Sequence, residues 1–150
     1  MFKIRYINLF LLGLLCSVLS SCETSYADNN GVLGGMWQLE SWNVTDEEGE
    51  TSVKATKEDG IYYSIQREFI QFSQTTKDNN NYYRRMFGRM SCSAGKMVIT
   101  NILTAKNEPA TLDDVSQYGV PADGVFVIES LSKERLVLSY KNNKLCFRKY

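Results

Sequence analysis

The sequence contains no histidine. Histidine is the most common catalytic acid or base near neutral pH and a frequent zinc ligand, so its absence excludes the usual hydrolytic triads and histidine-based zinc sites. An enzyme would have to rely on tyrosine, lysine or carboxylates instead. We therefore expect that the protein is not an enzyme and that it holds no metal and no other cofactor.

The chain also lacks an excess of either charge, with 17 basic and 17 acidic side chains. Removal of residues 1–21 would take away Lys3 and Arg5 and no acid, which leaves 15 basic side chains, 17 acidic ones and a formal charge of −2. A chain this close to neutral has no overall field to hold nucleic acid or an anionic membrane face. A nucleic-acid partner is not expected.

A long hydrophobic run is missing too. Lys3 and Arg5 precede an apolar stretch over residues 7–19. This stretch is shorter than the roughly 20 apolar residues that span a bilayer, and with its basic start it is typical of a signal peptide. An uncleaved apolar anchor and a plain secretory signal are the alternatives.

The end of the apolar stretch carries a more specific signal, the run Leu19-Ser20-Ser21-Cys22. This run resembles the lipobox of bacterial lipoproteins, which implies cleavage after Ser21 and lipid attachment to Cys22. Residues 22–34 are rich in Asn and Gly and are expected to form a tether. The expected domains are a signal peptide (1–21), a lipidated tether (22–34) and one folded domain (35–150). The expected location is the cell envelope, on the outer membrane.

Proline is scarce, and Pro109 and Pro121 are its two occurrences. Aromatic and β-branched residues cluster in short segments separated by Asn, Gly, Asp and Lys, which is typical of antiparallel strands. Hairpin-length connections make sequence neighbours pair, and this predicts an all-β up-and-down meander of seven or eight strands closed into a small barrel. The expected strands cover residues 36–45, 62–74, 82–92, 96–104, 124–131, 134–141 and 144–150.

Residues 105–123 form a connection that is long for a compact domain, and we expect a lid or plug there. Thr111 is placed to cap a short helix with Asp113 and Asp114 in its first turn, and Gly119 is placed to end it. The two acids could instead form a catalytic dyad, but no base or metal cluster accompanies them.

Four cysteines occur, of which Cys16 lies in the expected signal peptide and Cys22 is the expected lipidation site. The remaining pair, Cys92 and Cys146, would favour a disulfide outside the cytoplasm. The expected strand order places them on strands with different neighbours, so we predict that both stay unpaired.

The first and last strands carry a family resemblance. Gly35 and Trp37 open the first strand and a basic residue lies on the last, a pattern that resembles the lipocalins, in which a cation stacks on a tryptophan at the barrel floor. Alternation along the last strand assigns this role to Lys149. Three further segments resemble lipocalin-like lipoproteins of gut Bacteroidetes over residues 34–150, namely Phe69-Ile70-Gln71-Phe72-Ser73, Tyr118-Gly119-Val120-Pro121 and the stretch from Ile128 to Leu138.

The segment over residues 82–92 is the one internal indication of binding chemistry. In one orientation Tyr83, Arg85, Phe87 and Arg89 face inward, and the two guanidinium groups could hold a ligand carboxylate. In the other orientation, the alternate set that includes the two methionines fills the core and the arginines are solvated. The second orientation is favoured, because buried unpaired arginines are costly.

Together these features predict a membrane-anchored, lipocalin-like lipoprotein that binds a small hydrophobic or amphipathic ligand at the cell envelope. Its expected partners are the membrane, through lipid on Cys22, and that ligand. The alternative is an accessory or assembly subunit whose packed barrel binds another envelope protein.

Overall fold

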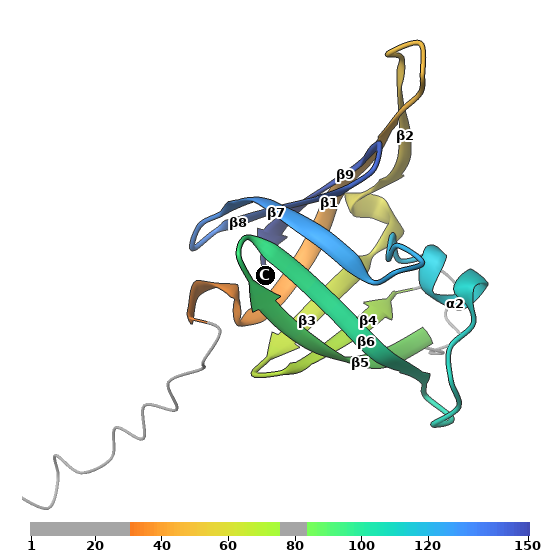
Figure 1. The fold of residues 1–150 in the computed structure, drawn as a ribbon, viewed down its shortest axis with the longest axis vertical. Helices are drawn as coiled ribbons and strands as arrows, with labels where there is room; N and C mark the ends of the chain where they lie inside the picture. The colour runs from red at the N-terminus through yellow and green to blue at the C-terminus, as the bar shows by residue number, and fades with distance from the viewer. Residues whose placement is uncertain (1–30, 76–83) are drawn as a thin grey trace, which may run out of the picture.

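The computed structural model describes residues 31–75 and 84–150. Two short 3-10 turns, one short helix and nine strands occur in these residues (Figure 1). In chain order they are η1 (Gly31–Leu33), β1 (Gly35–Thr45), β2 (Thr51–Thr56), η2 (Lys57–Asp59), β3 (Ile61–Gln66), β4 (Phe69–Gln74), β5 (Arg84–Ser93), β6 (Lys96–Thr104), α2 (Leu112–Ser116), β7 (Val125–Leu131), β8 (Arg135–Tyr140) and β9 (Asn143–Lys149).

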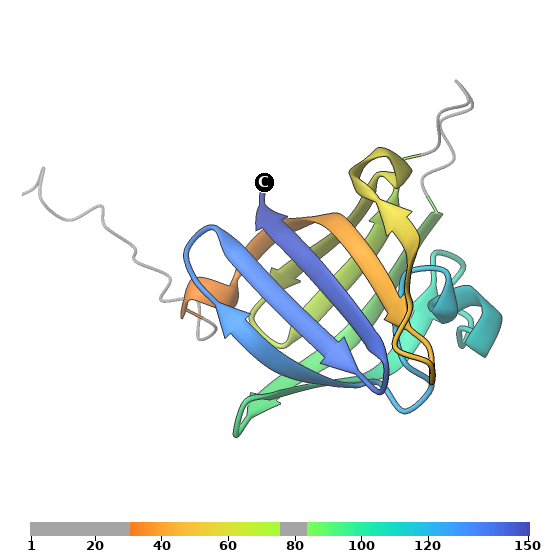
Figure 2. The same ribbon diagram turned by 90° about the horizontal axis from the view of Figure 1, so that it is seen from above.

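Eight of the strands close into a barrel (Figure 2). Each strand from β3 to β9 pairs antiparallel with the next, β9 pairs back with β1, and the first half of β1 pairs with β3. Because the sheet closes, every barrel strand is paired on both sides over at least part of its length. Small antiparallel sheets avoid edge-to-edge association in this way. The structure confirms the all-β meander that the short connections predict.

Two segments differ from the sequence-based expectation. Residues 62–74 form two strands rather than one, because the chain reverses at Arg67, which has a φ of +53°. This left-handed conformation is usually taken by Gly or Asn, so the turn carries no ordinary sequence signal. The second difference is β2, which pairs with the second half of β1 and lies outside the closed ring. Ala55 is its one buried residue, so β2 lacks the apolar alternation that marks a strand.

The register defines two ends of the barrel. Gly35 lies opposite Ile65, and Lys149 N donates to Glu134 O, which brings η1, the β3–β4 turn and the β7–β8 turn together. Antiparallel pairing of β4 with β5 adds the β5–β6 turn to this end. We call it the floor end, and we call the opposite end the plug end. The plug end carries the β1–β2 and β8–β9 turns, η2 and residues 105–124 (Figures 1 and 2).

Side chains fill the middle of the barrel. The Tyr63 ring lies 4.8 Å from Phe72 and 4.6 Å from Phe147, measured between ring centroids. These rings, which come from β3, β4 and β9, meet across the interior. The largest fully buried side chains are Trp37, Tyr63, Tyr118, Phe72, Phe126, Phe147, Leu39, Ile61, Ile70, Met97, Leu136 and Leu138.

Residues 105–123 plug the barrel as expected. Thr111 caps α2, because its side chain accepts from Asp114 N at 3.2 Å while Asp114 Oδ2 accepts from Thr111 N at 2.9 Å. Gly119 follows the helix with a φ of +79°. The Tyr63 hydroxyl donates to the backbone oxygen of buried Tyr118 at 2.7 Å, which fixes the plug to the barrel wall. Asp114 thus caps the helix, the role that its spacing from Thr111 favours.

Cys92 and Cys146 lie on strands that do not pair with each other. Cys92 is exposed at the end of β5 opposite Met97, and Cys146 lies on β9 opposite Val137. We predict that both thiols stay reduced in the folded protein, because a disulfide requires Cα atoms within about 7 Å. Denatured protein that lacks residues 1–21 and has Cys22 replaced or blocked should show two titratable thiols. Zero thiols would contradict this strand order.

Candidate functional site

Arg85 and Arg89 of β5 face solvent. Met86 and Met90 are buried, whereas Arg85, Phe87 and Arg89 are exposed. This confirms the favoured orientation, with the methionines in the core.

The interior carboxylate clamp is therefore not formed by these arginines. Arg89 instead lies 3.3 Å from Glu68 and stacks over the Phe69 ring at 5.5 Å, both on the outer surface. An exposed guanidinium keeps its hydration, and burial in the barrel would remove it. Tyr83, the fourth residue of this candidate set, lies outside the described residues.

The floor of the barrel has the geometry that the family resemblance implies. Trp37 is fully buried, and its Nε1 donates to Leu33 O at 2.8 Å. Lys149 Nζ lies 4.5 Å from the centroid of the Trp37 ring and donates to backbone oxygens of Val32 and Gly34. The cation thus ties η1 to the last strand and covers the ring. Leu33, which the sequence places in the tether, is buried in the core.

Gly35 is required at the floor by space as well as by conformation. Its φ is +118°, and a Cβ there would lie 2.8 Å from Lys149 Cε. A larger residue would push the lysine away from Trp37. The close approach of Lys149 explains why a glycine stands two residues before Trp37 in the sequence.

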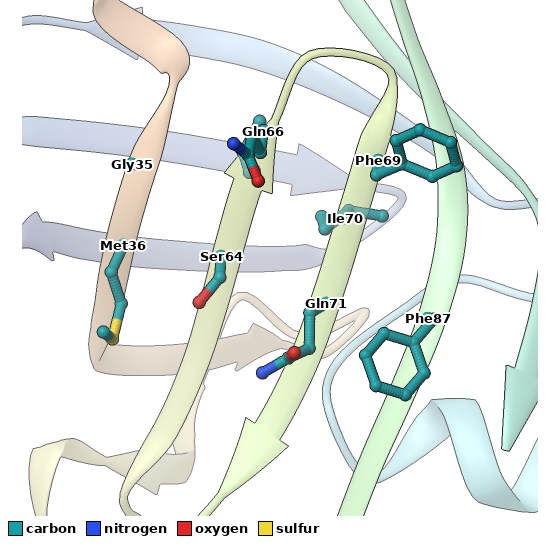
Figure 3. Close-up of a pocket in the computed structure, with 9 residues that line it drawn as sticks. Gly35, Met36, Ser64, Gln66, Phe69, Ile70, Gln71 and Phe87 are labelled. Carbon is teal, nitrogen blue, oxygen red and sulfur yellow. The ribbon is translucent and has the colours of Figure 1, made fainter. Parts of the chain in front are cut away.

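An outer groove of about 660 Å³ lies on the outer surface of β1, β3, β4 and β5 (Figure 3). Met36, Ser64, Gln71 and Phe87 lie opposite one another on successive strands and form a row across it. Phe69 lies nearer the floor end and extends the apolar surface. The groove is open and mostly apolar, and the side-chain amides of Gln66 and Gln71 also line it.

A second hollow, of about 610 Å³, lies at the plug end, and we call it the cup. Trp42, Ala55 and Ile61 are buried in its wall, and Val44 and Tyr140 are half-buried. Polar groups surround these apolar walls. The remaining lining residues are Lys54, Asp59, Gln74, Ser116, Gln117 and Asn143.

Two aromatic side chains of the cup are held in place. Trp42 Nε1 donates to Asn143 Oδ1 at 2.8 Å, and the Tyr140 ring packs edge-on against Phe126 with centroids 5.5 Å apart. Burial raises the pKa of the Tyr140 hydroxyl, so the hydroxyl stays protonated near neutral pH and can donate a hydrogen bond. The cup thus combines apolar walls with hydrogen-bonding groups.

The sequence did not reveal the cup, because a bulge changes the alternation in β1. Trp37 and Leu39 face inward, and strict alternation would then place Trp42 outside. The pairing with β9 shifts between Leu39 and Ser41, which turns Trp42 inward. The other walls come from separate strands and the end of α2, so no contiguous motif exists. The sequence feature that could have indicated the cup was the presence of two tryptophans, Trp37 and Trp42, in a single strand.

Among residues 31–75 and 84–150, no three His, Cys, Asp or Glu side chains gather in a way that could hold a metal ion. In the same part of the chain no helix has the length and hydrophobicity to cross a bilayer.

Solved structures share this fold. A lipocalin-like protein from Bacteroides uniformis is 24% identical, with a TM-score of 0.59, and the match covers 80% of this chain and 100% of that one. A protein from Bacteroides eggerthii is 20% identical, with a TM-score of 0.57, and the match covers 78% of this chain and 98% of that one. No curated protein matches. The family model described as lipocalin-like domain matches residues 17–150, and that family generally comprises non-enzymatic binding proteins. This chain therefore belongs to the lipocalin-like domain family.

Proposed function

We propose that this protein is a membrane-tethered binding protein, not an enzyme, that holds a small apolar or amphipathic molecule in the cup. The observation that carries the proposal is the cup itself. Trp42 and Tyr140 provide aromatic surface, and Gln117 and Asn143 provide amide groups at its rim. The volume of about 610 Å³ lies within the range of small-molecule sites in proteins.

The cup is favoured over the deep interior because the interior is occupied by side chains. Tyr63, Phe72 and Phe147 meet below it, and Tyr118 of the plug packs 6.0 Å from Phe72. A ligand in the deep interior would have to displace several buried rings. A ligand in the cup would leave these rings in place.

Attachment to the membrane is the second part of the proposal. Lipid on Cys22 would anchor the chain, and two or more acyl chains give stable membrane attachment. We place the protein in the cell envelope, on the outer membrane. The support is the run Leu19-Ser20-Ser21-Cys22 after a short apolar stretch.

Filling the cup should weaken ligand binding. Ala55→Phe adds a ring to the cup wall, and it should weaken binding of the fluorescent probe anilinonaphthalene sulfonate by about tenfold or more. Val53→Phe is the matched control, because Val53 lies on the same strand, is exposed and does not line the cup. The control should bind the probe as the wild type does. Thermal melts by circular dichroism would establish that both variants fold. Equal affinity in the two folded variants would refute the cup as the site.

An accessory or assembly role is the second candidate function. The packed interior and the exposed Met36, Phe69 and Phe87 favour it, because such surfaces contact partners in many proteins. An envelope protein that co-purifies with the barrel while the cup is empty would support this role over ligand carriage.

A further inference from the structure

We infer that the floor end of the barrel docks on a lipid bilayer that contains anionic phospholipid. The inference deepens the proposed function, because the tether would bring this end of the barrel to the membrane. Its evidence is the surface of the floor end, and its test does not require the lipid on Cys22.

The first observation is that basic side chains gather at the floor end and acidic ones at the plug end, although the net charge of the whole chain is close to zero. The floor end, counted as its turns, the strand residues that flank them and Arg89, whose side chain pairs with Glu68 of the β3–β4 turn, carries six basic and two acidic side chains. Among the described residues, the connecting segments of the plug end carry the opposite excess. The floor-end basic residues are Arg67, Arg89, Lys96, Lys133, Arg135 and Lys149, and the acids there are Glu68 and Glu134. The plug-end acids are Asp46, Glu47, Glu48, Glu50, Glu58, Asp59, Glu108, Asp113, Asp114 and Asp123, against Lys57, Lys106 and Lys141.

The ion pairs at the floor end do not remove this excess. Arg89 lies 3.3 Å from Glu68, and Arg135 lies 3.7 Å from Glu40, which is on β1 away from the turns. Both arginines stay more than half exposed, so their charges remain in contact with solvent and with an approaching surface.

The second observation is a concentration of exposed apolar side chains at the same end. Val32 is 41% exposed, Phe69 51% and Leu131 39%. They come from η1, the start of β4 and the end of β7, which meet at the floor end. Met36 and the terminal Tyr150 add to this surface, since Tyr150 N donates to Met36 O at 2.8 Å. Water-exposed apolar groups beside basic ones are typical of surfaces that lie in a membrane interface.

The third observation is where the chain leaves the barrel. The described chain begins at the floor end with Gly31, and η1 lies there beside the β7–β8 turn (Figure 2). Residues 23–30 reach at most about 28 Å when fully extended. A lipid on Cys22 would thus keep the floor end within a short distance of the bilayer, while the cup opens at the opposite end.

Charge complementarity identifies the partner. A basic surface is attracted to the anionic headgroups of a leaflet within about one Debye length, and apolar side chains then enter the acyl boundary. The acidic plug end would be repelled from the same headgroups. Both effects orient the barrel with the cup away from the membrane.

The test uses the chain from residue 22 onward with Cys22→Ser, which carries no acyl chain. All eight barrel strands and their core lie in residues 31–150, so removal of residues 1–21 leaves the barrel intact. In vesicle co-sedimentation, this protein should bind phosphatidylcholine vesicles that contain phosphatidylglycerol. It should bind pure phosphatidylcholine vesicles far more weakly, and salt should weaken the binding.

Matched charge reversals locate the surface. Lys96→Glu with Lys133→Glu should weaken binding to the phosphatidylglycerol vesicles by about tenfold or more. Lys57→Glu with Lys106→Glu changes the net charge equally at the plug end and should leave floor-end docking within about twofold of the parent protein. Phe69→Ser with Leu131→Ser should weaken binding while keeping its dependence on phosphatidylglycerol.

Equal losses in the two charge-reversal pairs, or no binding by the parent protein, would overturn the inference. Floor-end variants that lose an envelope protein partner but bind vesicles normally would also overturn it, in favour of a protein partner. Probe binding in the cup should be unchanged in the floor-end variants, so failure of docking and failure of the proposed ligand site can be told apart.

Discussion

Replacement of Trp37 by alanine should lower the free energy of unfolding by about 3–5 kcal/mol, as for other buried tryptophans. The side chain is fully buried at the barrel floor, and its removal also takes away the hydrogen bond to Leu33 O and the surface on which Lys149 stacks. A loss of this size is a large part of the total stability of a small domain, so a large fraction of the variant protein would be unfolded at the growth temperature of its host. Urea denaturation followed by circular dichroism measures the change.

Two milder substitutions separate the contributions of the ring, its hydrogen bond and the lysine cation to this loss of stability. Trp37→Phe keeps an aromatic ring and loses the Nε1 hydrogen bond, and it should cost less than the alanine variant. Lys149→Met keeps the aliphatic stem and removes the cation, so it tests the contacts to the ring and to the backbone oxygens of Val32 and Gly34. An alanine variant with the stability of the wild type would show that the glycine and tryptophan pattern at the start of β1 has no structural role.

Replacement of Cys22 by serine should release the protein from the membrane fraction of its host. The serine hydroxyl does not replace the thiol that carries the lipid in the proposed lipobox, so incorporation of labelled palmitate should fall to background. Weak docking by the floor end alone is reversible and sensitive to salt, so a high-salt wash should complete the release.

Cys16→Ser is the matched control for this experiment, because Cys16 lies within the apolar stretch and does not follow the Leu-Ser-Ser run. It should keep both the label and the membrane association. Persistent membrane association of the Cys22 variant without label, after the salt wash, would mean that the apolar stretch itself is the anchor.

Features that depend on local chemistry could be predicted from the sequence. Thr111 and Asp114 have the spacing of a helix cap and form one. Alternation along the last strand selects Lys149 over its neighbour Arg148, and Lys149 is the residue that stacks on Trp37. In both cases the interaction depends on the spacing of a few residues and on one element whose geometry is regular.

Features that depend on departures from regular geometry could not be predicted. The reversal at Arg67 uses a left-handed residue without glycine, and the bulge after Leu39 changes which face Trp42 presents. Strand β2 is held by its pairing with β1, although Ala55 is its one buried side chain. The bulge in β1 and strand β2 form part of the cup, and for this reason the sequence pointed instead to the regular segment around Arg85.

The separation of charge belongs to the same class. Composition alone argues against attraction to an anionic surface, because basic and acidic side chains are nearly equal in number. The barrel register decides which of them share an end, and it places Lys96 and Lys133 toward the same end although they lie in different hairpins. A property that is absent from the whole chain can thus be present on one surface of the fold.

Mass spectrometry of protein purified from the membranes of its own host tests the central claim most directly, since it asks whether a small molecule occupies the cup. Organic extracts of the wild-type protein should contain one apolar or amphipathic compound in an amount comparable to the protein. Extracts of the Ala55→Phe variant, prepared in the same way, should lack that compound, whereas Val53→Phe should retain it. No such compound in the wild type, or the same amount in the folded Ala55→Phe variant, would contradict a ligand site in the cup.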